Sequence, residues 1–364
     1  MRLAIDASRT TTARVTGTER YAIQIIRELL RLNDQHEIAL YFRHTPARDL
    51  FPADHILRPD AVTRRVIPFP RAWTHVRFAA ALALHTPDLT WVPAHTLPFA
   101  FPGRAAVTVH DLGYRYFPDA HPAGQRAYLD LTTRTSARRA AVVLADSQAT
   151  ADDLTSFYRI SPAKIRVIYP GVDAPRIGDI DAVRRKYRLP ERYFLFLGTL
   201  QPRKNIARLV EAYGEWRNVH RADPAALVLA GGEGWLYDPA WTADKPGVYV
   251  TGYVDEADKG ALYAGALGLV FPSLYEGFGF PVLEAMLCGC PVIASTTSSL
   301  PELCADAALL IDPFDVGAMA AAMTRLSDDP AVRDGLIERG RAQARRFTWE
   351  SAARAALAAF ESVG

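Results

Sequence analysis

The chain has only three cysteines, Cys288, Cys290 and Cys304, among its 364 residues. Their odd number and their spacing fit neither a zinc site nor a disulfide framework, so we expect buried free thiols in a reducing compartment. No apolar run approaches the ~20 residues that cross a bilayer, and the segment 1–11 lacks the long apolar stretch of a signal peptide. These shortages argue against a disulfide-stapled secreted domain and predict a cytoplasmic protein.

A strong excess of charge of either sign is also missing, because the formal net charge is only +2. The charge is unevenly placed: residues 1–175 hold 22 Lys and Arg against 16 Asp and Glu, and the remainder holds 20 against 24. A basic first half could attract an anionic acceptor or a lipid surface, although an ordinary solvated surface explains it equally well. The basic residues are scattered and form no continuous stripe on a helix, so we expect no nucleic-acid partner.

What the chain does have is a regular alternation of short apolar runs with helical patterns, which restarts after a polar bridge at roughly 170–190. Its length fits two domains of common size. Buried strands joined by helices predict parallel sheets covered on both faces. We therefore predict an α/β fold of two doubly wound Rossmann-like domains facing a central cleft, with ligands beyond the carboxyl ends of the strands. The expected strands are 2–7, 37–42, 89–94, 106–111, 141–146 and 166–171, then 193–199, 226–231, 248–254, 267–273, 291–295 and 308–312.

The first helix is predicted over 18–32, with Thr18 as its N-cap. Its apolar residues recur at the 3.6-residue spacing of one buried face. These residues are Tyr21, Ala22, Ile25, Ile26, Leu29 and Leu30.

The stretch 275–285, "YEGFGFPVLEA", places Glu276 and Glu284 on either side of a glycine-rich loop. Pro281 fits the first turn of a helix. The loop before it would therefore lead into a helix N-terminus, where N–H groups and the helix dipole favour an anion. In the loop, Gly277 and Gly279 flank Phe278 and let the backbone approach a phosphate.

The two carboxylates would then serve the two ends of a nucleotide sugar. We expect Glu284, placed in the first helical turn, to pair with two vicinal ribose hydroxyls. Glu276, at the strand end, would meet the sugar attached beyond the phosphates. Each carboxylate taken alone is equally well explained as structural, since a glutamate in a first turn is favoured by the dipole.

Three further segments support an anion site. Arg203 and Lys204 stand between a strand and a helical pattern, where two cations suit a diphosphate and would stabilise it as a leaving group. His110 ends a strand and is expected to face the cleft, where it could hydrogen-bond a sugar. Gly17 precedes the first helix and offers another close approach for a phosphate or acceptor. Solvated cations and a structural histidine are the plainer alternatives.

Together these motifs resemble the retaining glycosyltransferases of family 4, which have the GT-B architecture of two Rossmann-like domains. The resemblance rests on "GTLQPRKN", on "PSLYEGFGFPVLEAMLCGCPVIAS" with its Glu-x7-Glu pattern, and on Gly17, and it runs the length of the chain. It implies an acceptor domain over 1–175, a nucleotide-sugar donor domain over 176–346 and a final helix within 347–364 that packs back on the first domain.

Carried over by position, the resemblance makes His110 the active-site histidine near the transferred sugar and Arg203 with Lys204 the diphosphate clamp. Glu284 would be the ribose ligand, Glu276 the residue touching the sugar, and Tyr253 with Val254 the segment that holds the base. One departure concerns the "LG" strand end, where many relatives continue with arginine and this chain has Thr199. The phosphates would depend all the more on the two remaining cations and on backbone groups.

The resemblance also implies the chemistry. Retaining enzymes of this kind are described as transferring the sugar by front-face attack, in which the leaving phosphate takes the acceptor proton and no protein nucleophile is needed. We predict that no metal or other cofactor is required. GDP-mannose is the best guess for the donor, because the "GTLxPRKN" segment resembles that of bacterial polysaccharide mannosyltransferases, while related sequences use dTDP-rhamnose or UDP-sugars.

Other activities remain open at this point. A sugar-nucleotide epimerase of the same architecture and a non-catalytic nucleotide-sugar-binding protein are the alternatives. A phosphorylase would need a cofactor lysine that we cannot place, and a nicotinamide-linked oxidoreductase is disfavoured because no Gly-x-Gly-x-x-Gly follows the first strand.

The acceptor is expected to be a glycan or lipid-linked oligosaccharide held mainly by the first domain. The segment 70–85, with Trp73, Arg71 and Arg77 near an apolar run, could contact the inner face of the membrane. A packed core helix is the plainer interpretation of the same segment.

Overall fold

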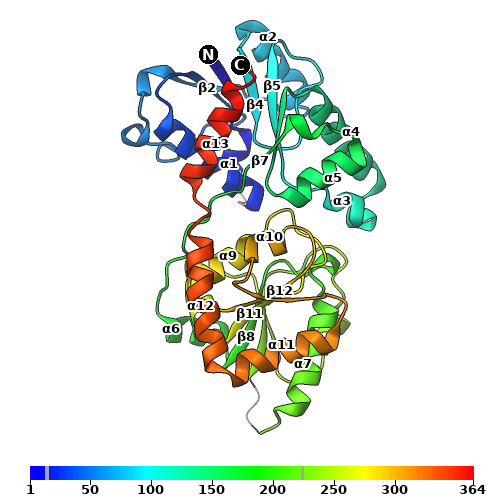
Figure 1. The fold of residues 1–364 in the computed structure, drawn as a ribbon. Coiled ribbons are helices and arrows are strands. Elements are labelled where there is room, and N and C mark those ends of the chain that lie inside the picture. The colour runs from blue at the N-terminus through cyan, green and yellow to red at the C-terminus, as the bar shows by residue number, and fades with distance from the viewer. Residues whose placement is uncertain (13–15, 223–224) are drawn as a thin grey trace. The chain divides into compact units, whose positions relative to one another are not determined.

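The computed structural model describes residues 1–12, 16–222 and 225–364. These residues form two compact units, an N-terminal unit of Met1–Gly171 with Phe347–Gly364 and a C-terminal unit of Val172–Arg346. In the described part of each unit the strands form one parallel sheet, with helices packed on it (Figure 1). The predicted α/β class with two doubly wound sheets is confirmed.

The sheet of the N-terminal unit has the strand order β3-β2-β1-β4-β5-β6-β7. The chain builds outward from β1 to β3 on one side and from β4 to β7 on the other, so the topological switch lies between β1 and β4. The edge strand β3 was not predicted, because only the first and last residues of its "VTRRV" sequence are apolar and neither is buried. The strands are β1 (Arg2–Asp6), β2 (Glu37–Phe42), β3 (Val62–Val66), β4 (Leu89–Val92), β5 (Arg104–Val109), β6 (Val142–Ala145) and β7 (Ile165–Val167).

Opposite faces of this sheet pack on different helices because successive strand residues point to opposite sides. On one face lie α1 and α13, which run side by side in Figure 1; Trp91 of β4 packs on Phe360 of α13 with ring centroids 5.2 Å apart. On the other face Val107 and Val109 join one core cluster with Phe78 and Leu82. The helices of the unit are α1 (Gly17–Leu32), α2 (Ala79–His85), α3 (Gly113–Tyr116), α4 (Ala123–Arg139), α5 (Gln148–Tyr158) and α13 (Trp349–Glu361).

The first helix buries all six of its predicted apolar residues. Its N-cap was predicted wrongly, since Thr16 and not Thr18 caps the helix. Thr16 accepts from the N3 backbone, while the Glu19 side chain bonds back to the Thr16 N–H at 3.1 Å, which forms a capping box. Thr18 therefore lies inside the first turn.

The segment 70–85 is helical and amphipathic, with four buried residues, Trp73, Phe78, Ala81 and Leu82. A single π-helical turn, η4 (Thr74–Phe78), runs directly into α2. Trp73 and Phe78 stack with centroids 5.1 Å apart and are buried. Val76 and Leu84 point outward, with 51% and 76% of their surface exposed. The packed-core interpretation therefore holds for one face of this segment, and its other face is exposed. Among the described residues, no helix is both long and apolar enough to cross a membrane.

The C-terminal unit repeats the plan with the strand order β10-β9-β8-β11-β12-β13, so its switch lies between β8 and β11. Its strands are β8 (Tyr193–Leu197), β9 (Ala226–Ala230), β10 (Val248–Gly252), β11 (Gly268–Phe271), β12 (Val292–Ser295) and β13 (Leu309–Ile311). Its helices are α6 (Ile180–Tyr187), α7 (Ile206–Val219), α8 (Lys259–Ala264), α9 (Phe280–Leu287), α10 (Leu300–Cys304), α11 (Val316–Asp328) and α12 (Pro330–Ala344). In each sheet, the edge just beyond the switch point is where a ligand is expected.

Candidate active site

The two loops at the switch point of the C-terminal unit bring three charged side chains together. Arg203 and Lys204 follow β8, and Glu276 follows β11. The Glu276 carboxylate accepts a hydrogen bond from Arg203 Nη1 at 3.1 Å and pairs with the Lys204 ammonium through its other oxygen. The two loops and their three charged side chains therefore meet within one unit.

The cluster is held by backbone that is itself tightly bonded. The Leu274 N–H donates to the Arg203 carbonyl at 2.8 Å, which joins the two loops. Asn205, in the left-handed region at φ 62°, donates to the Pro272 carbonyl at 3.2 Å. The Ser299 hydroxyl donates to the Glu276 carbonyl at 3.1 Å. The cations thus sit on a one-turn 3-10 helix, η7 (Pro202–Lys204), between β8 and the start of α7.

The electrostatics of the cluster favour a bound anion. Burial alone would raise the pKa of Glu276, but the charges of Arg203 and Lys204 outweigh it and lower that pKa below its ordinary value. The carboxylate is therefore ionised at neutral pH, and the three groups together carry one net positive charge. Lys204 is 7% exposed and its Nζ lies 4.7 Å from the Phe271 ring centroid, so its charge is largely shielded from water.

The loop after Glu276 enters α9 as predicted, with Pro281 in the first turn. Gly279 is the N-cap at φ 132°, and a Cβ there would lie 2.9 Å from Leu300 Cδ2, so both conformation and space require glycine. Gly277 and Phe278 are buried in the same loop.

Glu284 lies one turn further along α9 than predicted. The first turn of the helix contains no acidic residue, because α9 begins only at Phe280. Glu284 is 2% exposed, and its Oε2 accepts from the Tyr263 hydroxyl of α8 at 3.1 Å. The helix dipole is therefore a weaker explanation for a glutamate at this position. Its role as a ribose ligand stays a prediction.

The predicted base-holding segment follows the edge strand β10. Tyr253 is 71% exposed and Val254 is 5% exposed. An exposed aromatic ring beyond the carboxyl end of a strand is available to stack on a planar base. This role also stays a prediction.

His110 belongs to the N-terminal unit, where it is more enclosed than predicted. Its Nδ1 lies 2.6 Å from Asp146 Oδ2, and its Nε2 lies 3.2 Å from the Pro93 carbonyl. Both partners are acceptors, so both ring nitrogens carry protons and the ring is an imidazolium. Burial opposes that charge, but Asp146 raises the pKa of His110 above its ordinary value. In this conformation neither nitrogen is directed to a cleft, and any contact with a sugar would exchange one of these bonds.

Sequence reasoning missed His95, which lies three residues beyond β4. Its Nε2 accepts from the His110 backbone N–H at 3.3 Å, and its buried Nδ1 has no hydrogen-bond partner in the described part of the chain. Burial, reinforced by the nearby His110 charge, lowers the pKa of His95 to about 4. The rule that drew attention to His110, a histidine just after an apolar strand, applies equally to His95.

Gly17 also lies in the N-terminal unit, as the first residue of α1. Residues 13–15 of the preceding loop lie outside the described residues, so the structure does not test its proposed approach to a ligand. Within the described chain, Glu19 of the same helix pairs with Arg9 at 3.1 Å.

Among the described residues, no group of three or more His, Cys, Asp or Glu side chains is placed to hold a metal ion. The chain has a single Asp-x-Asp triplet, Asp179 to Asp181. Asp179 caps α6 by accepting from Ala182 N–H at 3.0 Å, and Asp181 pairs with Arg184 at 3.2 Å. Asp179 thus serves as a helix cap and Asp181 as an ion-pair partner within α6. The three cysteines are free and buried, and burial raises the pKa of Cys288 to about 11 and that of Cys304 to about 12.

Comparisons with known proteins agree with this geometry. A family profile described as Glycosyltransferase Family 4 matches residues 15–176, and one described as Glycosyl transferases group 1 matches residues 179–343. The two matches together span most of both units. The two profile boundaries fall close to the division between the units.

Two curated mannosyltransferases are similar to this chain. The chain is 30% identical over 358 residues to the O-antigen chain mannosyltransferase B of Escherichia coli, with 93% of each chain covered. It is 29% identical over 289 residues to the mannosyltransferase WbdA of Escherichia coli, of which it spans about a third, 34%.

Solved structures show the same fold at lower identity. The Anabaena protein HepE in complex with UDP-glucose superposes with a TM-score of 0.74 at 17% identity, covering 100% of both chains. Sucrose-phosphate synthase from Thermosynechococcus elongatus has the same TM-score at 22% identity, covering 99% of this chain and 98% of its own. The chain therefore belongs to glycosyltransferase family 4 and is a GT-B glycosyltransferase similar to bacterial mannosyltransferases.

Proposed function

We propose that the protein is a retaining hexosyltransferase that moves mannose from GDP-mannose to a glycan or lipid-linked acceptor in cell-surface polysaccharide synthesis. The observation that carries the proposal is the cluster of Arg203, Lys204 and Glu276 at the switch point of the C-terminal unit. The similarity to O-antigen mannosyltransferases supports the sugar and the process.

The proposed transfer breaks one bond at the sugar C1 and forms another. The bond between sugar C1 and the diphosphate oxygen breaks, a bond from C1 to the acceptor oxygen forms, and the acceptor proton passes to the departing phosphate. Arg203 and Lys204 would stabilise the negative charge that grows on the diphosphate. Glu276, beside them, would hold sugar hydroxyls and so fix C1 against the acceptor. No protein group is asked to form a covalent intermediate, and no metal or other cofactor is part of the proposal.

The remaining donor contacts are proposed by position. Glu284 would accept from ribose hydroxyls, Tyr253 and Val254 would hold the base, and the backbone of 277–279 would approach the phosphates. Gly17 and His110, in the N-terminal unit, would contact the donor or acceptor once substrates are bound.

Peripheral contact with the cytoplasmic face of the membrane is also part of the proposal. Val76, exposed, adjoins His75, whose ring stacks on the half-exposed ring of Phe99 at 4.0 Å. Arg71 and Arg77 are exposed near the same turn and would suit anionic headgroups. Sedimentation with phosphatidylglycerol vesicles tests this contact, and protein that stays in the supernatant would remove it.

The function itself is tested by incubating the protein with GDP-mannose, UDP-glucose and dTDP-rhamnose. Release of GDP from GDP-mannose, accelerated by acceptor, is the expected result, and the anomeric configuration of the product reports retention. An altered sugar nucleotide without release would indicate an epimerase. Binding without turnover would indicate a non-catalytic binding protein.

A further inference from the structure

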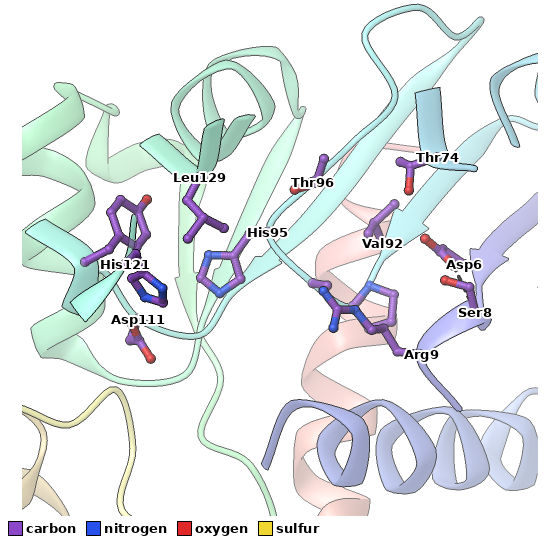
Figure 2. Close-up of a pocket in the computed structure, with 13 residues that line it drawn as sticks. Asp6, Ser8, Arg9, Thr74, Val92, His95, Thr96, Asp111, His121 and Leu129 are labelled. Atoms are coloured by element: carbon purple, nitrogen blue, oxygen red, sulfur yellow. Dashed lines mark hydrogen bonds between the residues drawn. The ribbon is translucent and has the colours of Figure 1, made fainter. Parts of the chain in front are cut away.

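The N-terminal unit has a cavity of about 230 Å³ at its own switch point, which no motif predicted. It is lined from the carboxyl ends of three strands: by Asp6, Ser8 and Arg9 at the end of β1, by residues 92–96 at the end of β4, and by Asp111 after β5. Figure 2 shows His95 in the middle, with Asp111 and His121 to one side and Arg9 to the other. This is the edge of a doubly wound sheet where ligands bind, and it lies wholly within one unit.

Charge in the cavity argues against an anionic ligand. Arg9 is the only permanent cation among the lining residues that the structure describes, and it is paired with Glu19 at 3.1 Å. The imidazolium of His110, whose ring lies 5.5 Å from that of His95, is likewise paired, with Asp146 at 2.6 Å. Asp111 adds a carboxylate, and His95 is neutral at pH 7 because its pKa is about 4. A phosphate about 6 Å from Asp111 would lose roughly tenfold or more in affinity through repulsion, even after solvent screening.

Hydrogen bonding favours a neutral polyol instead. Because His95 Nε2 accepts from a backbone N–H, the neutral ring carries its proton on Nδ1, which has no partner in the described part of the chain. That N–H would donate to a ligand oxygen. Asp111 Oδ1 accepts from Gly113 N–H at 2.7 Å, so its carboxylate is oriented and would accept from ligand hydroxyls. A sugar ring offers hydroxyls that both donate and accept. The volume is below the ~300–1,000 Å³ of pockets for drug-sized ligands, which suits one ring.

We infer that this cavity binds the neutral sugar unit that carries the acceptor hydroxyl, and that it selects against phosphate-bearing acceptors. The inference rests on the proposed function, which it deepens by giving the acceptor a chemical class. Asp111 and His95 are the recognition groups.

The test uses the full chain and saturation-transfer NMR titrations with methyl α-mannoside, the corresponding glucoside and galactoside, and mannose 6-phosphate. At least one neutral glycoside should bind more tightly than mannose 6-phosphate. The substitution Asp111→Asn keeps the oxygen that accepts from Gly113 but removes the charge, and it should weaken neutral glycoside binding about tenfold or more. Asp119→Asn, an exposed carboxylate of the same unit, is the matched control and should change nothing.

Three results would overturn the inference: tighter binding of mannose 6-phosphate, equal glycoside binding by Asp111→Asn, or no glycoside binding by protein that still binds nucleoside diphosphates. The comparison of ligands on the unsubstituted protein decides the question even if Asp111→Asn fails to fold. Loss of nucleoside diphosphate binding and of donor cleavage would instead count against the proposed function, so the two failures are distinct.

Discussion

Replacing Glu276 with glutamine should move diphosphate affinity and sugar transfer in opposite directions. In the unliganded protein the Glu276 carboxylate occupies both cations, with 3.1 Å between its Oε2 and Arg203 Nη1. A diphosphate on the same cations would lie within about 6 Å of this carboxylate. At an effective dielectric of 20, one pair of unit charges at that distance repels by about 2.8 kcal/mol, which screening reduces to about 1–2 kcal/mol. Glu276→Gln should therefore bind pyrophosphate and GDP about five- to thirtyfold more tightly.

Transfer by the same variant should fall, because the amide cannot accept two charge-assisted hydrogen bonds from sugar hydroxyls. We expect a loss of about tenfold to a hundredfold in kcat, from one such interaction of about 1.5–3 kcal/mol. Isothermal titration calorimetry with pyrophosphate and GDP at a fixed 0.15 M salt measures the first effect, and an acceptor-dependent GDP-release assay measures the second.

The matched control is Glu338→Gln on α12, which makes the same charge change at an exposed position of the same unit. It should leave both quantities unchanged. Weaker pyrophosphate binding by Glu276→Gln would refute the reasoning, since it would mean that the carboxylate organises the cations more than it competes for them. Unchanged transfer would show that Glu276 does not touch the sugar.

Further predictions concern the loop, the histidines and metals. Gly279→Ala should destabilise the protein by about 1–3 kcal/mol in urea unfolding, because of its φ of 132° and the contact with Leu300, whereas Gly178→Ala, with open space around its Cβ, should not. For His95 the folded pKa of about 4 lies below the ordinary 6.5, so the unfolded state binds the proton first. His95 therefore contributes up to about 3 kcal/mol to the free energy of unfolding above pH 6.5, and this contribution is lost as the pH falls toward 4. The free energies of unfolding of the natural protein and of His95→Asn, measured across this pH range, should differ by an amount that depends on pH. A difference that is the same at every pH would contradict the lowered pKa of His95. Transfer should survive EDTA, and activity abolished by EDTA and restored by manganese would contradict metal independence.

Local motifs allowed much of the C-terminal unit to be predicted. The sequence motifs at Arg203–Lys204 and at Glu276 are short, and each follows a strongly apolar strand. Since β8 and β11 are neighbours in a parallel sheet, the residues that follow them lie close together. The position of Glu284 was wrong by one turn, because the prediction did not locate the residue at which α9 begins. The start of α9 depends on the positive φ of Gly279 and on its packing against α10, and both are set by tertiary structure.

The surroundings of His110 could not be predicted in the same way. Its partners Asp146 and Pro93 follow two other strands, and only the assembled sheet brings the three together. The edge strand β3 escaped prediction for a related reason, since a strand at the rim of a sheet buries too little to show a clear apolar pattern. The cavity around His95 is likewise a product of three strand ends.

The most direct test of the central claim is a crystal structure of the protein with GDP bound. We predict the β-phosphate within hydrogen-bond distance of Lys204 Nζ and the Arg203 guanidinium, with the Glu276 carboxylate turned from these cations toward the sugar position. Density for the diphosphate elsewhere in the molecule, with the ion pairs of Glu276 intact, would contradict the account.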